Sequence, residues 1–519
     1  MPLNAGASGY GSAAGPGLSA SAGGSESAPL LIPEPDPEPD PEPVQQWQPL
    51  TKEELEVAAG GPGWRKARCY LVLLFWLAWL AMLAVAIAII VLSPRPVAPS
   101  LEWWQKSLFY QLQPDLLTEK QAGRSGSVNA LCEQLPYLRS LGIDALILQG
   151  LFDKKASPLT LNGTGEIFGT LSQIQHLLAE SNKADLKVVL DVCEGDLVGP
   201  QDVAENADNT SKLAAKHALR FWLEQGAAGF AICDTDVAYL GEVKCCSHTT
   251  LLEWKGVFKE FSSEEKERIL VVKQTKEVLP PLKSFSQGNV TLVDMVMRSI
   301  LPSSRHLLSA KKVADAIETL LKTNLEDIWP SWIVGGKASL DLKELLLVLV
   351  MTLPGSPVVQ YDEDIVQAKN VSLKVSSSQS DTNQSSDTHT DGEKRSVAAL
   401  FSTLSHSRAR EEALLFGNFT FLPFNSSTDS SSSNSTLPSP PAPILAFLRS
   451  WGCVHFLILL NVGPEPHTLD PSQAPSLPKA GVFVANTRMD RMGSTSLDRL
   501  QLRPHEAIVI KLFEPGSYS

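Results

Sequence analysis

Four carboxylates stand at or just after short apolar runs in the middle of the chain, where they could do acid–base chemistry: Asp191, Asp234, Asp236 and Glu277. Two carboxylates on opposite sides of a bond can act as an acid and as a nucleophile or base, which is what hydrolysis of a glycosidic bond requires. The alternative is that these side chains cap helices or face water at loop ends. Strand register decides between the two, because one step along a strand turns a side chain to the other face.

Other catalytic arrangements find little support in the sequence. The 9 histidines are scattered, and none belongs to a cluster with metal-ligand spacing. The segment Gly335-Gly336-Lys337 lacks the upstream glycine and the following Ser or Thr of a phosphate-binding loop, so we interpret it as a turn. The sequence therefore predicts neither a metal site nor a bound cofactor.

The elements that must position these residues alternate between short apolar runs and amphipathic stretches. The strands are expected near 107–113, 143–150, 186–192, 227–234, 268–274, 291–298, 327–334 and 356–362. The helices between them include Val128–Leu141, Thr210–Gln225, Leu251–Phe261, Ala310–Leu321 and Leu340–Met351, with a last one near Val397–Ala413. Eight such repeats predict a (β/α)8 barrel over residues 107–413.

The chain after the barrel has strand-like runs and no long helical pattern. These runs are Leu414–Phe421, Cys453–Asn461, Gly481–Ala485 and Ala507–Phe513. They predict a small antiparallel β-domain over residues 414–519. Two polar insertions, Ser376–Glu393 and Asn425–Pro443, are expected to be surface loops.

Residues 70–92 contain no charged residue and read YLVLLFWLAWLAMLAVAIAIIVL. A bilayer core about 30 Å thick needs roughly 20 apolar residues at the helical rise, so this run predicts one transmembrane helix. The run is too long and too far from the N-terminus for a cleavable signal peptide, which indicates a retained signal-anchor. Basic residues gather before it, including Arg65, Lys66 and Arg68, so the N-terminus is expected in the cytosol.

Small residues recur at helical spacing along this anchor, at Ala78, Ala81, Ala84 and Ala88. Such a stripe allows another helix to pack closely in lipid. The alternative is that alanine is simply tolerated at these positions.

The residues on either side of the anchor fall into three segments that differ in composition. Residues 1–49 are rich in Gly, Ala, Ser and Pro and predict a disordered cytosolic tail. In residues 50–69, Thr51 and Glu54 have the spacing of a capping box, so a juxtamembrane helix should begin at Lys52 and stop before Gly60. Residues 93–106 are expected to form a stalk that leads to the barrel.

Bulk composition limits the possible functions. The net charge of -13 argues against nucleic acid as a partner, and 43% hydrophobic residues over 519 positions suffice for a sizeable core. N-glycosylation sequons all follow the anchor, as an extracytoplasmic segment requires. Their asparagines are Asn162, Asn209, Asn289, Asn370, Asn383, Asn418, Asn425 and Asn434.

Several motifs together resemble the α-amylase family of glycoside hydrolases and, within it, the heavy chains of heteromeric amino-acid transporters. They are LTKEELEVAAGGPGW at 50–64, LLFWLAWLAML in the anchor, Trp103-Trp104, DIWPSW at 327–332 and MTLPGSPVVQYDEDI at 351–365. The resemblance implies an α/β fold with a single transmembrane helix, an extracellular barrel of the α-amylase type and a C-terminal antiparallel β-domain.

The same resemblance implies that the catalytic carboxylates are lost. The strand-four motif Gly-Phe-Arg-x-Asp is replaced by Gly229-Phe230-Ala231-Ile232-Cys233, so Cys233 occupies the nucleophile position. The acid position falls at or near Gln274, and the third carboxylate falls on Ala338. Only Asp191 matches the family pattern.

The resemblance thus implies an inactive ancillary subunit that associates with a polytopic light chain and brings it to the plasma membrane, with the light chain carrying the amino-acid path. One alternative is a membrane-anchored glycoside hydrolase with relocated acids. Another is an adhesion or signalling partner, for example of integrins. All three have a type II, single-pass topology.

Two expectations concern cysteines. Cys193 and Cys233 follow consecutive strands with inward parity, so they form either a disulfide or two unpaired thiols. Related heavy chains carry a cysteine just outside the membrane that bonds to the light chain, but here Pro96 stands in its place. We therefore expect a complex without an interchain disulfide, with Cys245 or Cys246 as the alternative bridging thiols.

Overall fold

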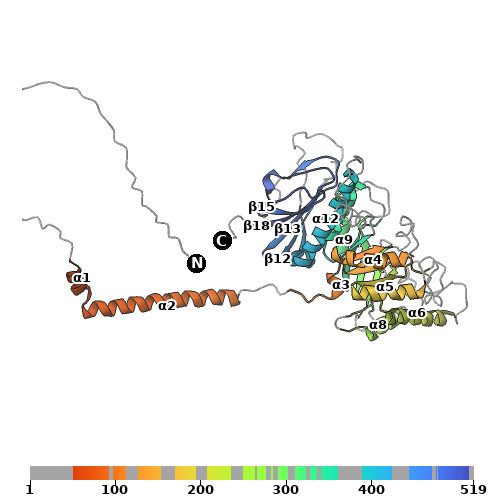
Figure 1. The fold of residues 1–519 in the computed structure, drawn as a ribbon, viewed down its shortest axis with the longest axis horizontal. Coiled ribbons are helices and arrows are strands. Elements are labelled where there is room, and N and C mark those ends of the chain that lie inside the picture. The colour runs from red at the N-terminus through yellow and green to blue at the C-terminus, as the bar shows by residue number, and fades with distance from the viewer. Residues whose placement is uncertain are drawn as a thin grey trace, which may run out of the picture. The chain divides into compact units, whose positions relative to one another are not determined.

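A computed structural model gives the fold of the chain (Figure 1). It describes residues 51–92, 98–112, 127–152, 170–193, 207–234, 249–263, 266–275, 282–284, 290–301, 310–322, 328–335, 340–360, 388–422, 444–469, 475 and 477–513. The contacts divide the chain into two compact units, residues 1–94 and 95–519.

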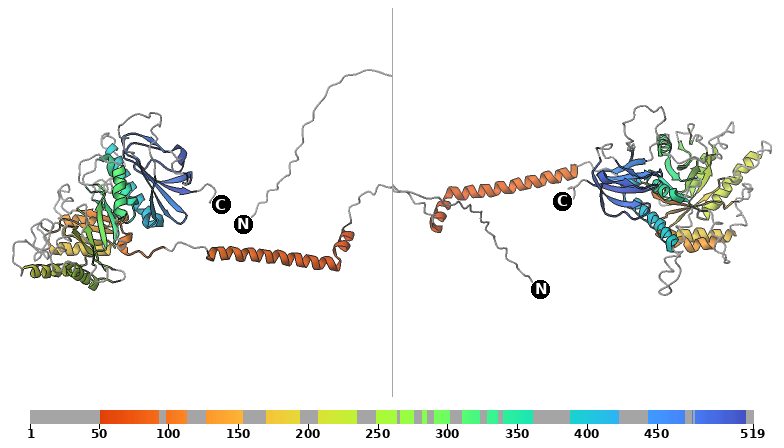
Figure 2. Two further views of the ribbon diagram at one scale, coloured as in Figure 1. Left: turned by 180° about the vertical axis from the view of Figure 1, so that it is seen from behind. Right: turned by 90° about the horizontal axis from the view of Figure 1, so that it is seen from above.

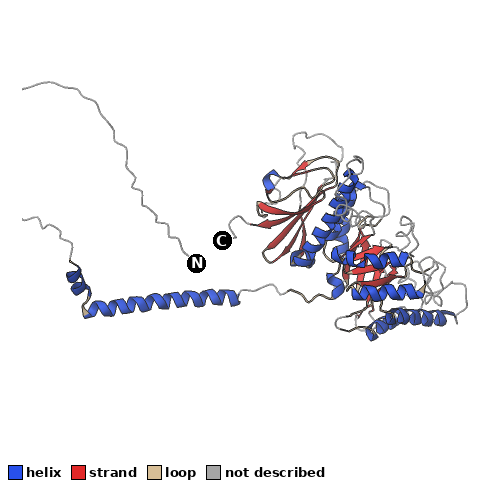
Figure 3. Ribbon diagram, in the orientation of Figure 1, coloured by secondary structure: helices blue, strands red, loops and turns tan. Residues whose placement is uncertain are grey.

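The second unit contains a closed barrel of eight parallel strands, surrounded by helices (Figure 3). Its strands are β1 (Phe109–Leu112), β2 (Ala145–Leu148), β3 (Lys187–Asp191), β4 (Gly229–Cys233), β5 (Ile269–Lys273), β8 (Met295–Ser299), β9 (Trp329–Ile333) and β10 (Ser356–Gln360). They pair around the barrel in the order β1-β10-β9-β8-β5-β4-β3-β2. All eight expected strands are therefore confirmed, with ends that differ by a few residues.

Helices alternate with most of the strands, although α3 precedes β1 and the described residues between β5 and β8 contain two short strands instead of a helix. They are α3 (Trp103–Lys106), α4 (Ser127–Ser140), α5 (Leu171–Lys183), α6 (Ala207–Glu224), α8 (Thr249–Glu260), α9 (Ala310–Lys322), α10 (Leu340–Thr352), α12 (Thr388–Arg410) and α13 (Glu412–Leu415). The expected loop Ser376–Glu393 is wrong at its end, because α12 already begins at Thr388. The other expected loop, Asn425–Pro443, lies outside the described residues.

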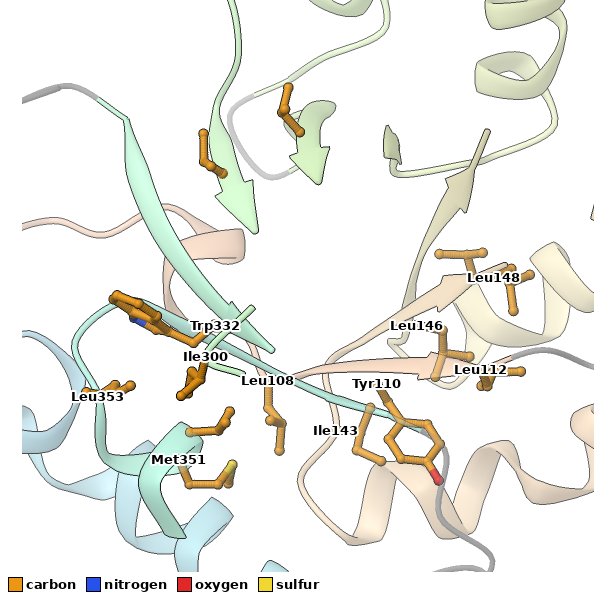
Figure 4. Packing of buried hydrophobic residues seen from close by; sticks show 14 of the residues in the cluster. Leu108, Tyr110, Leu112, Ile143, Leu146, Leu148, Ile300, Trp332, Met351 and Leu353 are labelled. Carbon is orange, nitrogen blue, oxygen red and sulfur yellow. The ribbon is translucent and has the colours of Figure 1, made fainter. Parts of the chain in front are cut away.

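The barrel strands alternate between two apolar layers. On β2, Ala145 and Ile147 belong to the cluster inside the barrel. Leu146 and Leu148 belong to the larger cluster between the strands and the helices, part of which is drawn in Figure 4. This period of two follows from strand geometry and fixes which residues point into the barrel.

An antiparallel sheet of six strands lies beside α12, as both views in Figure 2 show. It comprises β11 (Asn418–Phe421), β12 (Ile444–Trp451), β13 (Val454–Asn461), β18 (Ala507–Phe513), β15 (Ala480–Asn486) and β16 (Ser494–Ser496), in that order. Sequence reasoning missed β12 and β16, since the apolar run of β12 directly follows the polar insertion. Short pairs are formed by β14 (His467–Thr468) with β17 (Gln501–Leu502) and by β6 (Lys283–Ser284) with β7 (Val290–Thr291).

The first unit contains α1 (Lys52–Ala59) and α2 (Pro62–Leu92). The Thr51 and Glu54 capping box is present and α1 ends before Gly60, as the sequence predicts. Helix α2 starts before the apolar stretch at residue 70, because proline fits the first turn of a helix and residues 65–68, Arg-Lys-Ala-Arg, are good helix formers. The basic residues before the span therefore lie within the same helix.

Candidate functional site: the barrel mouth and the anchor

At the carboxyl end of the barrel, Asp191 forms a buried ion pair. Asp191 is the last residue of β3, and its side chain has no solvent exposure. Its Oδ2 lies 2.6 Å from Nζ of Lys273, the last residue of β5. Its Oδ1 accepts a hydrogen bond of 3.0 Å from the backbone N–H of Cys193. The one aspartate that matches the hydrolase pattern is thus neutralised by a lysine.

The ion pair reaches across a strand, because β4 lies between β3 and β5. In the register of these strands Asp191 is beside Ala231, which in turn is beside Val271. The resemblance assigns an arginine to the position of Ala231. The methyl group of alanine leaves space above β4 for the longer side chain of Lys273. Sequence reasoning missed Lys273, although its inward parity with Ile269 and Val271 was a usable signal.

The nucleophile position is occupied by one half of a disulfide. Cys233 ends β4 and bonds to Cys193, with the two Cα atoms 4.9 Å apart. The interpretation as two unpaired thiols is wrong. A half-cystine has neither a carboxylate nor a free thiolate with which to attack a substrate.

The remaining candidate carboxylates are only partly described. Asp234 is buried and accepts hydrogen bonds from the backbone N–H and the hydroxyl of Thr275. It therefore links the ends of β4 and β5 and does not face water, so the expectation of a solvated loop-end carboxylate is wrong for Asp234. Gln274 donates its backbone N–H to the carbonyl of Met297 at 2.9 Å. Asp236, Glu277 and Ala338 lie outside the described residues.

The chemistry of this barrel end follows from these partners. An acid or base must be able to gain or lose a proton at the reacting bond, and a nucleophile must be free to approach it. The described carboxylates Asp191 and Asp234 are instead engaged by Lys273 and Thr275. Within the described residues, no group of three or more His, Cys, Asp or Glu side chains could hold a metal ion.

The anchor is a single long apolar helix. Within α2, the candidate span Gly63–Ile89 is long enough to cross a membrane, and its most apolar window of 18 residues has a mean hydropathy of 2.7. The side chains of Ala78, Ala81, Ala84 and Ala88 are all exposed along α2. The helix therefore offers its whole circumference, the alanine stripe included, to lipid or to another helix.

The structure places two of the sequon asparagines. Asn418 is exposed at the start of β11, and Asn209 lies in α6, where its side chain is not described. The other sequons fall outside the described residues: Asn162, Asn289, Asn370, Asn383, Asn425 and Asn434.

Solved structures with a similar fold include carbohydrate-active enzymes. The trehalose-6-phosphate hydrolase of Bacillus licheniformis has a TM-score of 0.57 at 13% identity, and the trehalulose synthase MutB of Pseudomonas mesoacidophila has 0.57 at 14%. Each match covers 80% of this chain and 100% of the other. At such identities the likeness concerns the fold alone. The chain is thus an amylase-like barrel protein with a C-terminal β-sheet and one candidate membrane span.

Sequence comparisons narrow the class. Residues 39–110 match the family model of the solute carrier family 3 member 2 N-terminus. The chain is 29% identical over 495 residues to the amino acid transporter heavy chain SLC3A2 of Oryctolagus cuniculus, covering 89% of this chain and 87% of that protein. It is 21% identical to the heavy chain SLC3A1 of Homo sapiens, covering 64% of each. These matches identify the chain as a relative of the SLC3A2 heavy chains, the 4F2 cell-surface antigen heavy chain type.

Proposed function

We propose that the chain is a catalytically inactive ancillary heavy chain, which binds a polytopic amino-acid transporter light chain and brings it to the plasma membrane. The observation that carries the proposal is the similarity to amino acid transporter heavy chains along 89% of this chain. A single apolar helix without an ionisable residue cannot line a path for polar substrates, so the light chain must supply that path.

The contacts at the carboxyl end of the barrel support the proposal that the chain has no glycosidase activity. Retaining and inverting glycosidases both need a free pair of carboxylates. Here Lys273 neutralises Asp191, and the nucleophile position is the disulfide-bonded Cys233. The alternative of an anchored glycoside hydrolase would need acids supplied from elsewhere in the chain.

The proposed topology is single-pass and type II, with residues 1–49 in the cytosol, a juxtamembrane segment at 50–69, a span at 70–92 and a stalk at 93–106. The barrel at 107–413 and the β-domain at 414–519 then lie outside the cell. Arg65, Lys66 and Arg68 precede the span, as the positive-inside rule requires, and the exposed sequon at Asn418 is accessible to glycosylation.

Affinity purification tests the main proposal. The tagged full-length chain is purified from membranes in mild detergent, and the proteins that copurify are identified by mass spectrometry. We expect a polytopic transporter, and its amino-acid uptake at the cell surface should fall when this chain is depleted. Recovery of integrins without a transporter would favour the adhesion alternative and contradict the proposal.

An activity assay tests the inactive barrel separately. The purified full-length chain and its Asp191→Asn variant are incubated with α-glucosides, and released glucose is measured. We expect no turnover by either protein. Turnover that disappears with Asp191→Asn would show that the barrel is a working hydrolase.

A further inference from the structure

A cavity of about 220 Å³ lies at the amino end of the barrel strands, opposite the mouth that holds Asp191. Its polar lining comes from the segments that lead into β3, β4 and β5, and α3 closes one side. The side chains that matter are Trp103, Asn182, Lys187, Lys266, Glu267 and Arg268. Neither the former catalytic positions nor the anchor contributes to this lining.

Three cationic side chains and one carboxylate line the cavity, namely Lys187, Lys266, Arg268 and Glu267. Lys266 and Arg268 have no carboxylate within ion-pair distance among the described residues, and Arg268 is about half-buried. Lys187 is only loosely paired, with 3.5 Å between its Nζ and Oδ1 of Asp185. The carboxylate of Glu267, the one acidic group in the lining, accepts a hydrogen bond of 3.0 Å from Nε1 of Trp104. Among the described residues, Lys266 and Arg268 are therefore the lining cations without a carboxylate partner. Lys187 pairs with Asp185, and Nε of Arg268 donates to the carbonyl of Phe261 at 3.4 Å.

The walls of the cavity are held in place by the fold. Trp103 donates its Nε1 to the carbonyl of Glu267 at 2.9 Å, and its ring packs against Phe109 inside the barrel. Gly226 has φ of 100°, and a Cβ there would lie 3.0 Å from Nδ2 of Asn182. The glycine therefore leaves space for the amide of Asn182 at the edge of the cavity, and the site is formed before any ligand arrives.

We propose that this cavity binds a phosphate monoester group. The guanidinium of Arg268 suits two phosphate oxygens at once, and the two ammonium groups add the charge that a dianion requires. Its volume leaves room beside the phosphate for a small organic group against the ring of Trp103. The same chemistry is offered by a soluble phosphate ester and by the headgroup of phosphatidic acid.

Calorimetric titration of the purified full-length chain in detergent tests the proposal and separates the two sources. The probes are inorganic phosphate, glycerol 3-phosphate, short-chain phosphatidic acid below its micellar concentration, and glycerol as the neutral control. We expect saturable binding of the phosphates that weakens with added salt, and none of glycerol. Preference for phosphatidic acid would assign the site to a lipid, and equal binding of glycerol 3-phosphate would assign it to a soluble ester. Absence of saturable binding for all three phosphates would overturn the proposal.

Charge variants locate the binding. Lys266→Gln and Arg268→Gln should each weaken phosphate binding by about fivefold or more, the scale of one lost charge-assisted hydrogen bond. The matched control is Lys259→Gln, which removes an exposed lysine of α8 that does not line the cavity. Lys266 is also exposed, so its substitution should leave the thermal unfolding midpoint unchanged. An equal loss with Lys259→Gln would show that only general charge attracts phosphate and would overturn the assignment.

Discussion

Lys273 is the residue on which the buried Asp191 depends. Substitution by methionine keeps most of the length of the side chain and removes its charge, so the carboxylate loses its ammonium partner in a buried position. Breaking one side of a buried ion pair costs about 3–5 kcal/mol. We expect Lys273→Met to lower the thermal unfolding midpoint of the purified chain, measured by circular dichroism.

The double variant Lys273→Met with Asp191→Asn is the control for this prediction. It removes both charges, and a neutral pair of similar volume should recover most of the lost stability. A Lys273→Met protein that unfolds at the parental temperature would contradict the importance of the ion pair.

The disulfide at the mouth has its own expected contribution. It closes a loop with a sequence separation of 40. In the chain-entropy model, a loop of that length is worth about 4 kcal/mol. We expect the double variant Cys193→Ser with Cys233→Ser to have a lower unfolding midpoint than the parental chain. Reductant should lower the midpoint of the parental chain and leave that of the double variant unchanged. Cys453→Ser, which removes an exposed free cysteine, should change neither value.

Strand periodicity predicted which of these side chains point into the barrel, but it did not predict the ion pair between Asp191 and Lys273. Inward parity placed Asp191, Cys193 and Cys233 at one barrel end, and the structure joins them there. The ion pair with Lys273 spans two strand positions and depends on the small Ala231 between them. Such a contact follows from the register of three strands in space, which strand periodicity alone does not determine.

At the scale of elements, two buried arginines hold the end of α10 against the β-domain. Arg449 of β12 donates to the carbonyls of Thr352 and Gly417, at 2.7 and 3.1 Å. Arg408 of α12 donates to the carbonyls of Met351 and Leu353, at 3.1 and 3.2 Å. Burial lowers the pKa of both guanidinium groups, to about 10 for Arg408. Positive charge at a helix C-terminus is favourable, so the carbonyls at the end of α10 offset part of the burial cost.

Because of these hydrogen bonds, we expect substitution of Arg449 to lower the stability of the fold. Arg449→Met would leave the carbonyls of Thr352 and Gly417 without their donor in a buried place, at a cost of about 2–4 kcal/mol. We expect a clearly lower unfolding midpoint by differential scanning calorimetry. The control is Arg410→Met, since Arg410 is exposed at the end of α12. Equal midpoints for the two variants would argue against the role of Arg449.

Element types were predictable because their periodicities are strong. The eight barrel strands and the helices between them follow apolar periods of two and about 3.6 residues. Strand β12 was not predicted, because its residues from Ile444 to Leu448 are apolar on both faces and show no period of two. A long polar insertion also precedes it. The sequence does not indicate that this strand carries Arg449, which joins β12 to the end of α10.

At the scale of the whole molecule, the cysteine positions bear on how the proposed light chain is bound. The resemblance to heavy chains implies a bridging cysteine at the position that Pro96 occupies here, and no cysteine occurs between Cys69 and Cys132 in the sequence. A covalent link raises the effective concentration of an interface that already exists, so its loss does not abolish association. We propose a non-covalent complex, held in part by the alanine stripe of α2.

The prediction is that the complex survives in mild detergent but separates on a denaturing gel without reductant. Bulk on the stripe should weaken it, because close helix packing in lipid needs small residues. We therefore expect Ala81→Leu with Ala84→Leu to reduce the amount of light chain that copurifies. Ala86→Leu adds the same bulk nearly opposite the stripe, at 100° per residue, and should not. A joint band that disappears with reductant would contradict the non-covalent complex and point to Cys245 or Cys246 as the bridging thiol.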